Sequence, residues 1–141
     1  MREDEAQISQ LLALLAVLLL AISLSSCGRA SQSGSEGGGM TMTLAVDPNP
    51  PLFGRPCLMT ITISGEDGAP VEGAMLNVKG DMTHAGMVPV IVETENGPGG
   101  VYAVPFEWTM GGDWIVTVVA TPVEGESFQR QFELTVEIPG G

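Results

Sequence analysis

The clearest sign of the fold is the stretch CLMTITI, residues 57–63. In an extended chain every second side chain points the same way, which puts Cys57, Met59, Ile61 and Ile63 on one face, opposite a leucine and two threonines. Strict alternation of this kind is typical of a half-buried β-strand. We therefore expect a strand whose apolar face, including the thiol of Cys57, lies in a protein core.

The same alternation recurs along the chain from residue 40 onward. Sequences rich in Gly, Pro, Asn and Asp separate the apolar runs and are typical of turns. Strands are expected at 41–46, 57–63, 74–79, 88–94, 101–108, 114–121 and 127–137. No longer window in this part has the spacing of an amphipathic helix. Short strands in this number predict an all-β fold, an immunoglobulin-like antiparallel β-sandwich of about seven strands.

The composition argues against several classes of protein. Five Lys and Arg side chains stand against 17 Asp and Glu, which gives a formal net charge of −12 over 141 residues. Since so acidic a chain has no basic surface to neutralise phosphates, we expect no nucleic-acid partner. The chain has a single histidine and lacks a G-x-S-x-G, phosphate-loop or H-E-x-x-H motif, so we expect that it is not an enzyme.

The N-terminus has the features of a secretion signal. Residues 11–24 read LLALLAVLLLAISL, an uncharged apolar run that is short for a membrane span and suits the centre of a signal peptide. The four residues that end at Cys27, Leu-Ser-Ser-Cys, resemble the lipobox of bacterial lipoproteins. This resemblance implies cleavage before Cys27 and lipidation of its sulfur, which would anchor the protein in a membrane.

These features divide the chain into three parts. We expect a signal peptide over 1–26, a lipidated Cys27 with a flexible Gly- and Ser-rich tether over 27–39, and a β-sandwich domain over 40–141. The residues before the apolar run are acidic, whereas signal peptides begin with positive charge. Two alternatives therefore stay open: a true start further downstream, or an anchor helix that is not cleaved. Both place the domain on the extracytoplasmic side of the cell membrane or cell envelope.

The segment 80–89, GDMTHAGMVP, holds the candidate metal ligands. Met82, His84 and Met87 lie within it, and His84 is the only histidine of the chain. Met82 and His84 share a face of an extended backbone, and the Ala-Gly pair that follows lets the chain turn back with Met87. Thioether sulfur and neutral imidazole nitrogen are ligands suited to Cu(I). Met110, in a turn of its own, is a further candidate and the least favoured one.

Each of these residues also has a structural interpretation. Methionine fills irregular gaps in cores, so the candidate methionines are also compatible with packing. If Cys27 carries lipid, Cys57 is the remaining thiol, and it is a small core residue, a soft metal ligand or half of an intermolecular disulfide. Trp108 and Trp114 are expected in the core.

Residues 54–137 contain motifs similar to those of a known family. They are Gly-Ala-Pro-Val-Glu-Gly-Ala at 68–74, Met82-x-His84, Gly-x-Tyr at 100–102, and Met-x-Gly-x-Trp at 110–114 after Phe106. With them the chain resembles the YtkA-like family, related to FixH-type domains, whose members are small extracytoplasmic immunoglobulin-like modules. Members often carry a Met- and His-rich loop at the position of Met82 and His84. The resemblance therefore implies copper handling or assembly of haem-copper oxidases, although this loop is shorter than the richest versions.

Two functions of different class follow. The first is a membrane-tethered lipoprotein that binds or delivers copper, as Cu(I), and passes it to a copper acceptor in a membrane protein complex, such as an oxidase subunit. The second is a metal-free immunoglobulin-like interaction module that contacts a membrane or envelope complex through a sheet edge or a loop.

Overall fold

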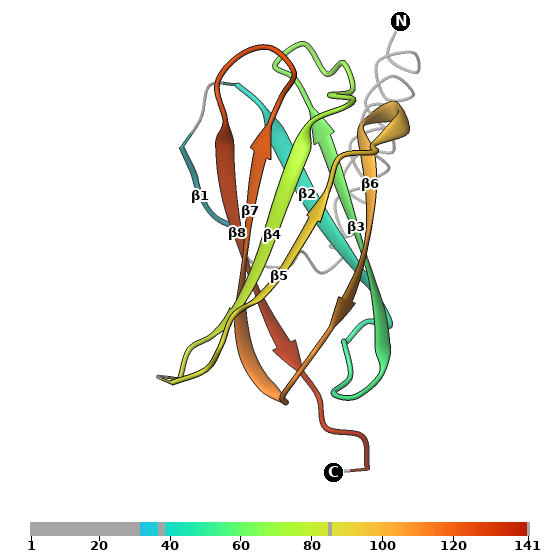
Figure 1. Cartoon of the computed structure of the whole chain (residues 1–141), viewed down its shortest axis with the longest axis vertical. Coiled ribbons are helices and arrows are strands. Elements are labelled where there is room, and N and C mark those ends of the chain that lie inside the picture. The colour runs from blue at the N-terminus through green and yellow to red at the C-terminus, as the bar shows by residue number, and fades with distance from the viewer. Residues whose placement is uncertain (1–31, 37–38, 85, 141) are drawn as a thin grey trace, which may run out of the picture.

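The chain folds into two antiparallel β-sheets that pack face to face (Figure 1). This computed structural model describes residues 32–36, 39–84 and 86–140. The predicted signal peptide and Cys27 lie outside these residues. Within them, no helix is both long and apolar enough to cross a membrane.

The strands divide between the sheets as five and three. The larger sheet has the order β1 (Gln32–Glu36), β8 (Phe128–Val136), β7 (Gly112–Thr121), β4 (Met75–Met82) and β5 (Val90–Thr94), and the smaller has the order β2 (Thr41–Asp47), β3 (Pro56–Ser64) and β6 (Val101–Glu107). A single-turn 3-10 helix, η1 (Pro98–Gly100), precedes β6. The predicted all-β, immunoglobulin-like sandwich is confirmed.

Strands β2 to β8 correspond one by one to the seven predicted from the sequence. The largest shift is at the end of β4, which was expected at residue 79 and continues to Met82. The start of β5 was expected at residue 88 and lies at Val90. Pro89 has no amide hydrogen to donate to β4, and the pairing of β5 with β4 accordingly starts at the Val90–Gly80 pair. The strand predicted at 101–108 ends one residue earlier than expected, because β6 ends at Glu107.

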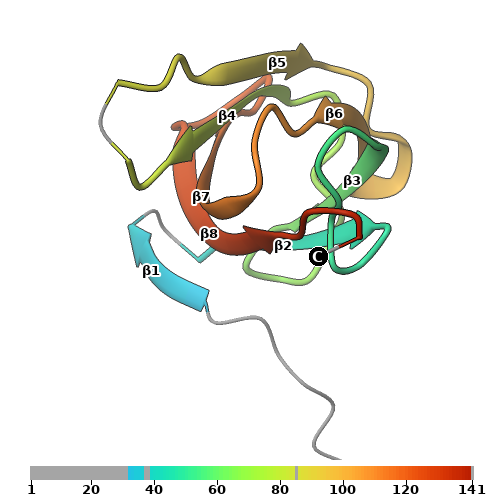
Figure 2. The same cartoon turned by 90° about the horizontal axis from the view of Figure 1, so that it is seen from below.

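Strand β1 was not predicted. The sequence indicates a flexible coil over the Gly- and Ser-rich stretch, but the structure pairs Gln32–Glu36 with β8 as the outermost strand of the larger sheet (Figure 2). The register shifts by one residue between Ser33 and Ser35, which flank a glycine. The pairing gives partners to backbone groups on the outer edge of β8, and this gain depends on tertiary structure that a local pattern does not contain.

The core between the sheets is apolar. No polar or charged residue is buried within the described part of the chain. The alternating face of β3 lies in the core as predicted, with Met59, Ile61 and Ile63 fully buried and Cys57 nearly so. The face of β3 that the sequence predicts to be buried is therefore part of the core. Met42 of β2 is buried in it as well.

A tyrosine latch closes one end of the core. Tyr102 is fully buried, and its hydroxyl donates a hydrogen bond to the carbonyl oxygen of Val71 (2.8 Å) and accepts one from the amide of Ala74 (2.9 Å). These bonds tie the β3–β4 connection to β6 in the smaller sheet. The ring of Tyr102 lies so close over Gly97 that a Cβ there would be 2.2 Å from it.

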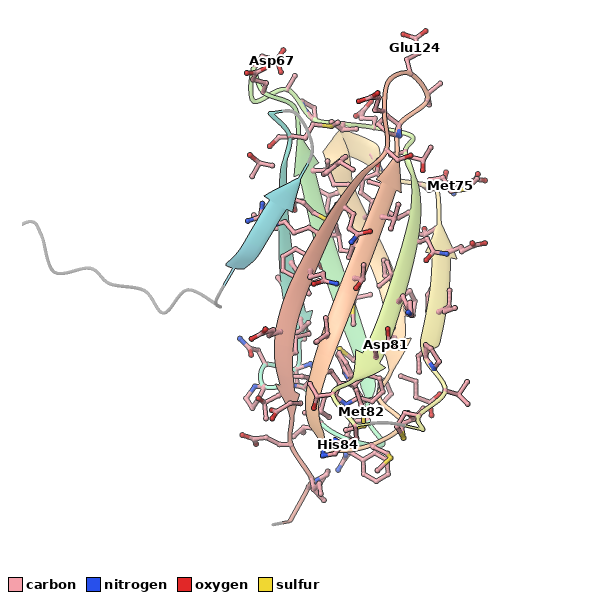
Figure 3. All side chains as sticks on the ribbon, turned by 90° about the vertical axis from the view of Figure 1, so that its left-hand side faces the viewer. Asp67, Met75, Asp81, Met82, His84 and Glu124 are labelled. Atoms are coloured by element: carbon pink, nitrogen blue, oxygen red, sulfur yellow. The ribbon has the colours of Figure 1, made fainter. Side chains whose placement is uncertain are left out.

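The connections between strands gather at two opposite ends of the sandwich. The β2–β3, β4–β5 and β6–β7 connections and the chain after β8 lie at one end, which we call the methionine end because it carries Met82, Met87 and Met110. The β3–β4, β5–β6 and β7–β8 connections lie at the other, which we call the acidic end. Figure 3 shows Met82 and His84 at the first and Asp67 and Glu124 at the second.

Candidate metal centre

The β4–β5 hairpin projects from the larger sheet at the methionine end. The last β4–β5 pair is Gly80 with Val90, but β4 continues through Asp81 and Met82 as a partner of β7 alone. The β5 side of these two residues is therefore open. The hairpin leaves the sheet here, and Figure 3 shows His84 just beyond the end of β4.

Met82 lies at the junction of the hairpin and the core. It is half-buried and packs against the core cluster. Its methyl group approaches Gly112 so closely that a Cβ at that position would lie 3.1 Å from it. The amide of Thr83 then donates to the carbonyl oxygen of Asp113 (3.3 Å). Met82 thus has a packing role, and its thioether stands at the inner end of the hairpin.

His84 and Met87 lie further out on the hairpin. His84 is exposed and Met87 is half-buried. Figure 3 shows His84 beside Met82 at the same end of the sandwich. The three ligands predicted from the sequence therefore lie on one hairpin. The side chains of Met82 and Met87 are half-buried there, and that of His84 is exposed.

Met110 belongs to the neighbouring β6–β7 turn. Its side chain is 46% exposed, so it is not a core residue. Its carbonyl oxygen accepts a hydrogen bond from Nε1 of Trp114 (3.1 Å), and Trp114 is paired in register with Met82. The turn that carries Met110 and the hairpin that carries Met82 are consequently joined through one buried residue.

An aromatic cluster forms the floor beneath these loops. Trp108 and Trp114 are each 1% exposed, which confirms the prediction that both belong to the core. Their rings meet edge to face with centroids 5.3 Å apart, and Phe106 lies 4.8 Å from Trp108. Among the described residues Nε1 of Trp108 has no hydrogen-bond partner, although it is buried. The hairpin therefore stands on a large apolar surface.

Carboxylates near the hairpin already have partners. Asp81 forms an ion pair with Lys79 (2.8 Å), and Asp113 accepts a hydrogen bond from Thr135 (2.9 Å). In the part of the chain that the structure describes, no three His, Cys, Asp or Glu side chains form a cluster suited to a metal. On the hairpin itself, residues 82–89, the side-chain donors are the thioethers of Met82 and Met87, the imidazole of His84 and the hydroxyl of Thr83, and thioether is a soft ligand. This set fits Cu(I) and does not fit a hard cation such as Mg²⁺ or Ca²⁺.

Cys57 is a core residue and is not one of the candidate metal ligands. It is 5% exposed at the start of β3, and it lines a hollow of about 550 Å³ together with Val90 and Val92 of β5 and Phe106 of β6. The core interpretation of Cys57 is confirmed. Its thiol is free among the described residues and lies at the wall of this hollow.

The sequence analysis missed the apolar character of the methionine end. Phe53, Val88 and Ile138 are all exposed there, beside Met110. Each belongs to a connection, or to the chain after β8, at the methionine end. The sequence alone does not group these residues, because which connections emerge at the same end depends on how the strands are arranged in the two sheets.

Comparison with known proteins places the domain. The sequence profile described as YtkA-like matches residues 36–119, which is more than half of the 141 residues. The match starts and ends earlier than the block 54–137 in which the motifs were found. A search of curated proteins gave no match. Among solved structures, the crystal structure of the PmoD soluble domain from Methylocystis sp. strain Rockwell aligns with a TM-score of 0.49 and 15% identity, over 73% of this chain and 96% of that one.

Proposed function

We propose, starting from the fact that the chain belongs to the YtkA-like family, that it is a membrane-tethered, extracytoplasmic lipoprotein that binds and delivers Cu(I). Met82, His84 and Met87 hold the ion, and Met110 is the candidate fourth ligand. The protein is not an enzyme in this proposal, and copper is its cargo. The observation that carries the proposal is the hairpin, on which the only histidine stands between two half-buried methionines.

The chemistry of the donors supports Cu(I) over other ions. Thioethers prefer soft, monovalent copper, and the two carboxylates on the strand residues beside the hairpin, Asp81 and Asp113, are bonded within the protein. The apolar floor under the hairpin also limits access of water from the inner side. Neutral ligands in such a place suit an ion of low charge.

The placement of the donors supports delivery as well as binding. His84 and Met110 are exposed, so an acceptor protein can approach the ion from outside while Met82 holds its position against Gly112. Transfer then proceeds by exchange of one soft ligand for another. The acceptor is a soft-ligand site in a membrane protein complex, because the proposed lipid on Cys27 keeps the domain at the membrane.

The experiment is a titration of the purified chain with Cu(I) in competition with a coloured chelator. Variants Met82→Leu, His84→Ala and Met87→Leu remove one donor each, and leucine preserves the apolar volume that Met82 contributes to packing. Met75→Leu is the matched control, since Met75 is an exposed methionine at the acidic end. We expect each donor variant to weaken Cu(I) binding by at least about tenfold, in line with the loss of one metal ligand, and the control to leave it unchanged.

Two results would overturn the proposal. One is an affinity for Cu(I) no tighter than micromolar in the unmodified chain. The other is equal loss of affinity in Met75→Leu and in the hairpin variants, because nonspecific thioether binding would then account for the signal.

The second candidate function is the metal-free interaction module. The observation that favours it is the row of exposed apolar side chains at the methionine end, which needs no metal to make contacts. If Cu(I) binding fails while the protein still copurifies with a membrane complex, and Ile138→Glu abolishes that copurification, this candidate replaces the first.

A further inference from the structure

Every connection at the methionine end exposes one large apolar side chain. These are Phe53 from the β2–β3 connection, Val88 from the β4–β5 hairpin, Met110 from the β6–β7 turn and Ile138 from the chain after β8. Their exposed fractions range from 40% for Phe53 to 83% for Val88. A grouping of this kind at one end of a small domain marks a contact surface.

Hydrogen bonds and close contacts link the connections that carry the four side chains. The amide of Phe53 donates to the carbonyl oxygen of Glu137 (2.8 Å), which holds the β2–β3 connection against the residue before Ile138. Gly111 lies against Ile138, where a Cβ would be 2.4 Å from the side chain, so the turn of Met110 adjoins it. The bond from Thr83 to Asp113 links the start of the hairpin that carries Val88 to β7, directly after that turn.

The two ends of the sandwich differ in the charge of their connections. The connections at the methionine end, together with residues 137–140, carry Arg55 and Glu137 as their charged residues at neutral pH. Those at the acidic end carry Glu66, Asp67, Glu72, Glu95, Glu124 and Glu126 and no Lys or Arg. Four further carboxylates, Asp47, Asp81, Glu107 and Asp113, lie on terminal strand residues behind the apolar tips. The tips are therefore the part of the domain least repelled by an anionic surface.

Strand β1 brings the N-terminal part of the chain toward the methionine end. β1 runs antiparallel to β8, with Gln32 opposite Phe132 and Glu36 opposite Gln129, so its N-terminal residue is the one nearer to the end of β8 at Val136. Residues 28–31 separate Cys27 from Gln32 and span at most about 14 Å. The distance along β8 from Phe132 to Val136 is about 13 Å at the usual rise of a strand.

We propose that the methionine end docks on the surface of the lipid bilayer, with Phe53, Val88, Met110 and Ile138 in contact with lipid and the acidic end pointing away. The occupant is the bilayer because only four residues separate Gln32 from Cys27, and because the connections at this end carry one positive and one negative charge, whereas those at the acidic end, which also exposes Met75 and Val123, carry six carboxylates. The proposal shares the membrane anchor with the proposed function and is independent of copper.

The test uses two methionines that the chain itself supplies at opposite ends. Met75, at the acidic end, is 54% exposed and Met110 is 46% exposed, so in free solution their thioethers oxidise at similar rates. The full chain, purified from membranes, is reconstituted in phosphatidylcholine vesicles with copper chelators present. It is then treated with chloramine-T, a charged oxidant, and the sulfoxide at each methionine is measured by mass spectrometry.

We expect Met110 to oxidise at least about fivefold more slowly than Met75, because lipid excludes the oxidant. The double variant Val88→Glu/Ile138→Glu should bring the two rates within about twofold of each other, since added carboxylates disfavour contact with lipid. Both substituted positions are exposed, and the buried Met59 reports any unfolding of the variant, because it oxidises only when the core opens.

Equal rates at Met75 and Met110 in unmodified protein would overturn the proposal. Protection of Met110 in native membranes but not in phosphatidylcholine vesicles would also overturn it, because a protein partner would then be the occupant. Loss of Cu(I) binding in the variants of the preceding section leaves either outcome unaffected, so the two proposals fail separately.

Discussion

The indole Nε1 of Trp114 donates a hydrogen bond to the carbonyl oxygen of Met110 across 3.1 Å. Trp114 is a buried core residue, whereas Met110 is exposed in the adjoining turn. Because Trp114 also lies opposite Met82 in the β4–β7 register, one core side chain positions the turn beside the hairpin. The arrangement of the candidate metal centre thus depends on the packing beneath it.

Replacing Trp114 with Phe should cost more stability than the same change at Trp108. Both residues are 1% exposed and lose similar volume, but only Trp114 has a hydrogen-bond acceptor for its Nε1 among the described residues. We expect the free energy of unfolding to fall by about 1 kcal/mol more in Trp114→Phe than in Trp108→Phe. Urea denaturation of the two variants measures this difference, and equal losses would show that the hydrogen bond to Met110 adds nothing.

Removal of the Tyr102 hydroxyl should destabilise the domain without affecting the methionine end. Tyr102→Phe leaves the amide of Ala74 and the carbonyl of Val71 without their partner at a buried site. The expected loss in the free energy of unfolding is about 1–3 kcal/mol. Cu(I) affinity, measured in the same preparation, should be unchanged; a fall in both quantities would mean that the two ends are coupled.

Cys57 should react slowly with thiol reagents in the folded protein. Its side chain is 5% exposed, although it lines the hollow between β5 and β6, so most of its surface is covered by protein. We expect the native rate with a disulfide reagent such as dithionitrobenzoate to be at least about a hundredfold below the rate in urea, because reaction requires local opening. A fast native rate, or a disulfide-linked dimer under air, would contradict the core assignment.

Cu(I) should raise the thermal stability of the chain if the hairpin binds it in the folded state only. At a free concentration one hundred times Kd, binding adds about 2.7 kcal/mol to the free energy of unfolding. For a domain of this size the rise in Tm is roughly 10 °C. Differential scanning calorimetry with and without Cu(I) measures it, with His84→Ala expected to show little rise and Met75→Leu the full rise.

The fold followed from the sequence wherever one face of a strand is buried. Alternation in β3 identifies Met59, Ile61 and Ile63 as core residues, since a slip by one residue would turn them all to solvent. Strand β1 offers no such pattern. Its pairing is decided by the open edge of β8, which lies about a hundred residues further along the chain.

The candidate site, too, could be predicted only in part from the sequence. Met82, His84 and Met87 are close in sequence, so a local pattern is enough to group them. The relation of Met110 to Met82 depends on the pairing of Met82 with Trp114, a contact between strands that are not neighbours in the chain. The grouping of Val88 and Ile138 at one end likewise depends on the tertiary fold, which decides at which end each connection emerges.

The Tyr102 latch and the β4–β5 hairpin lie at opposite ends of β4, with the apolar core between them. The bonds that close the sandwich are therefore made far from the loop that carries the candidate ligands. A hairpin placed in this way tolerates insertion and exchange: residues 83–89 can be lengthened or given more histidines while the closure of the domain is retained. The domain is in this sense a scaffold for loop grafting, on which other ion preferences can be built between Met82 and Val90.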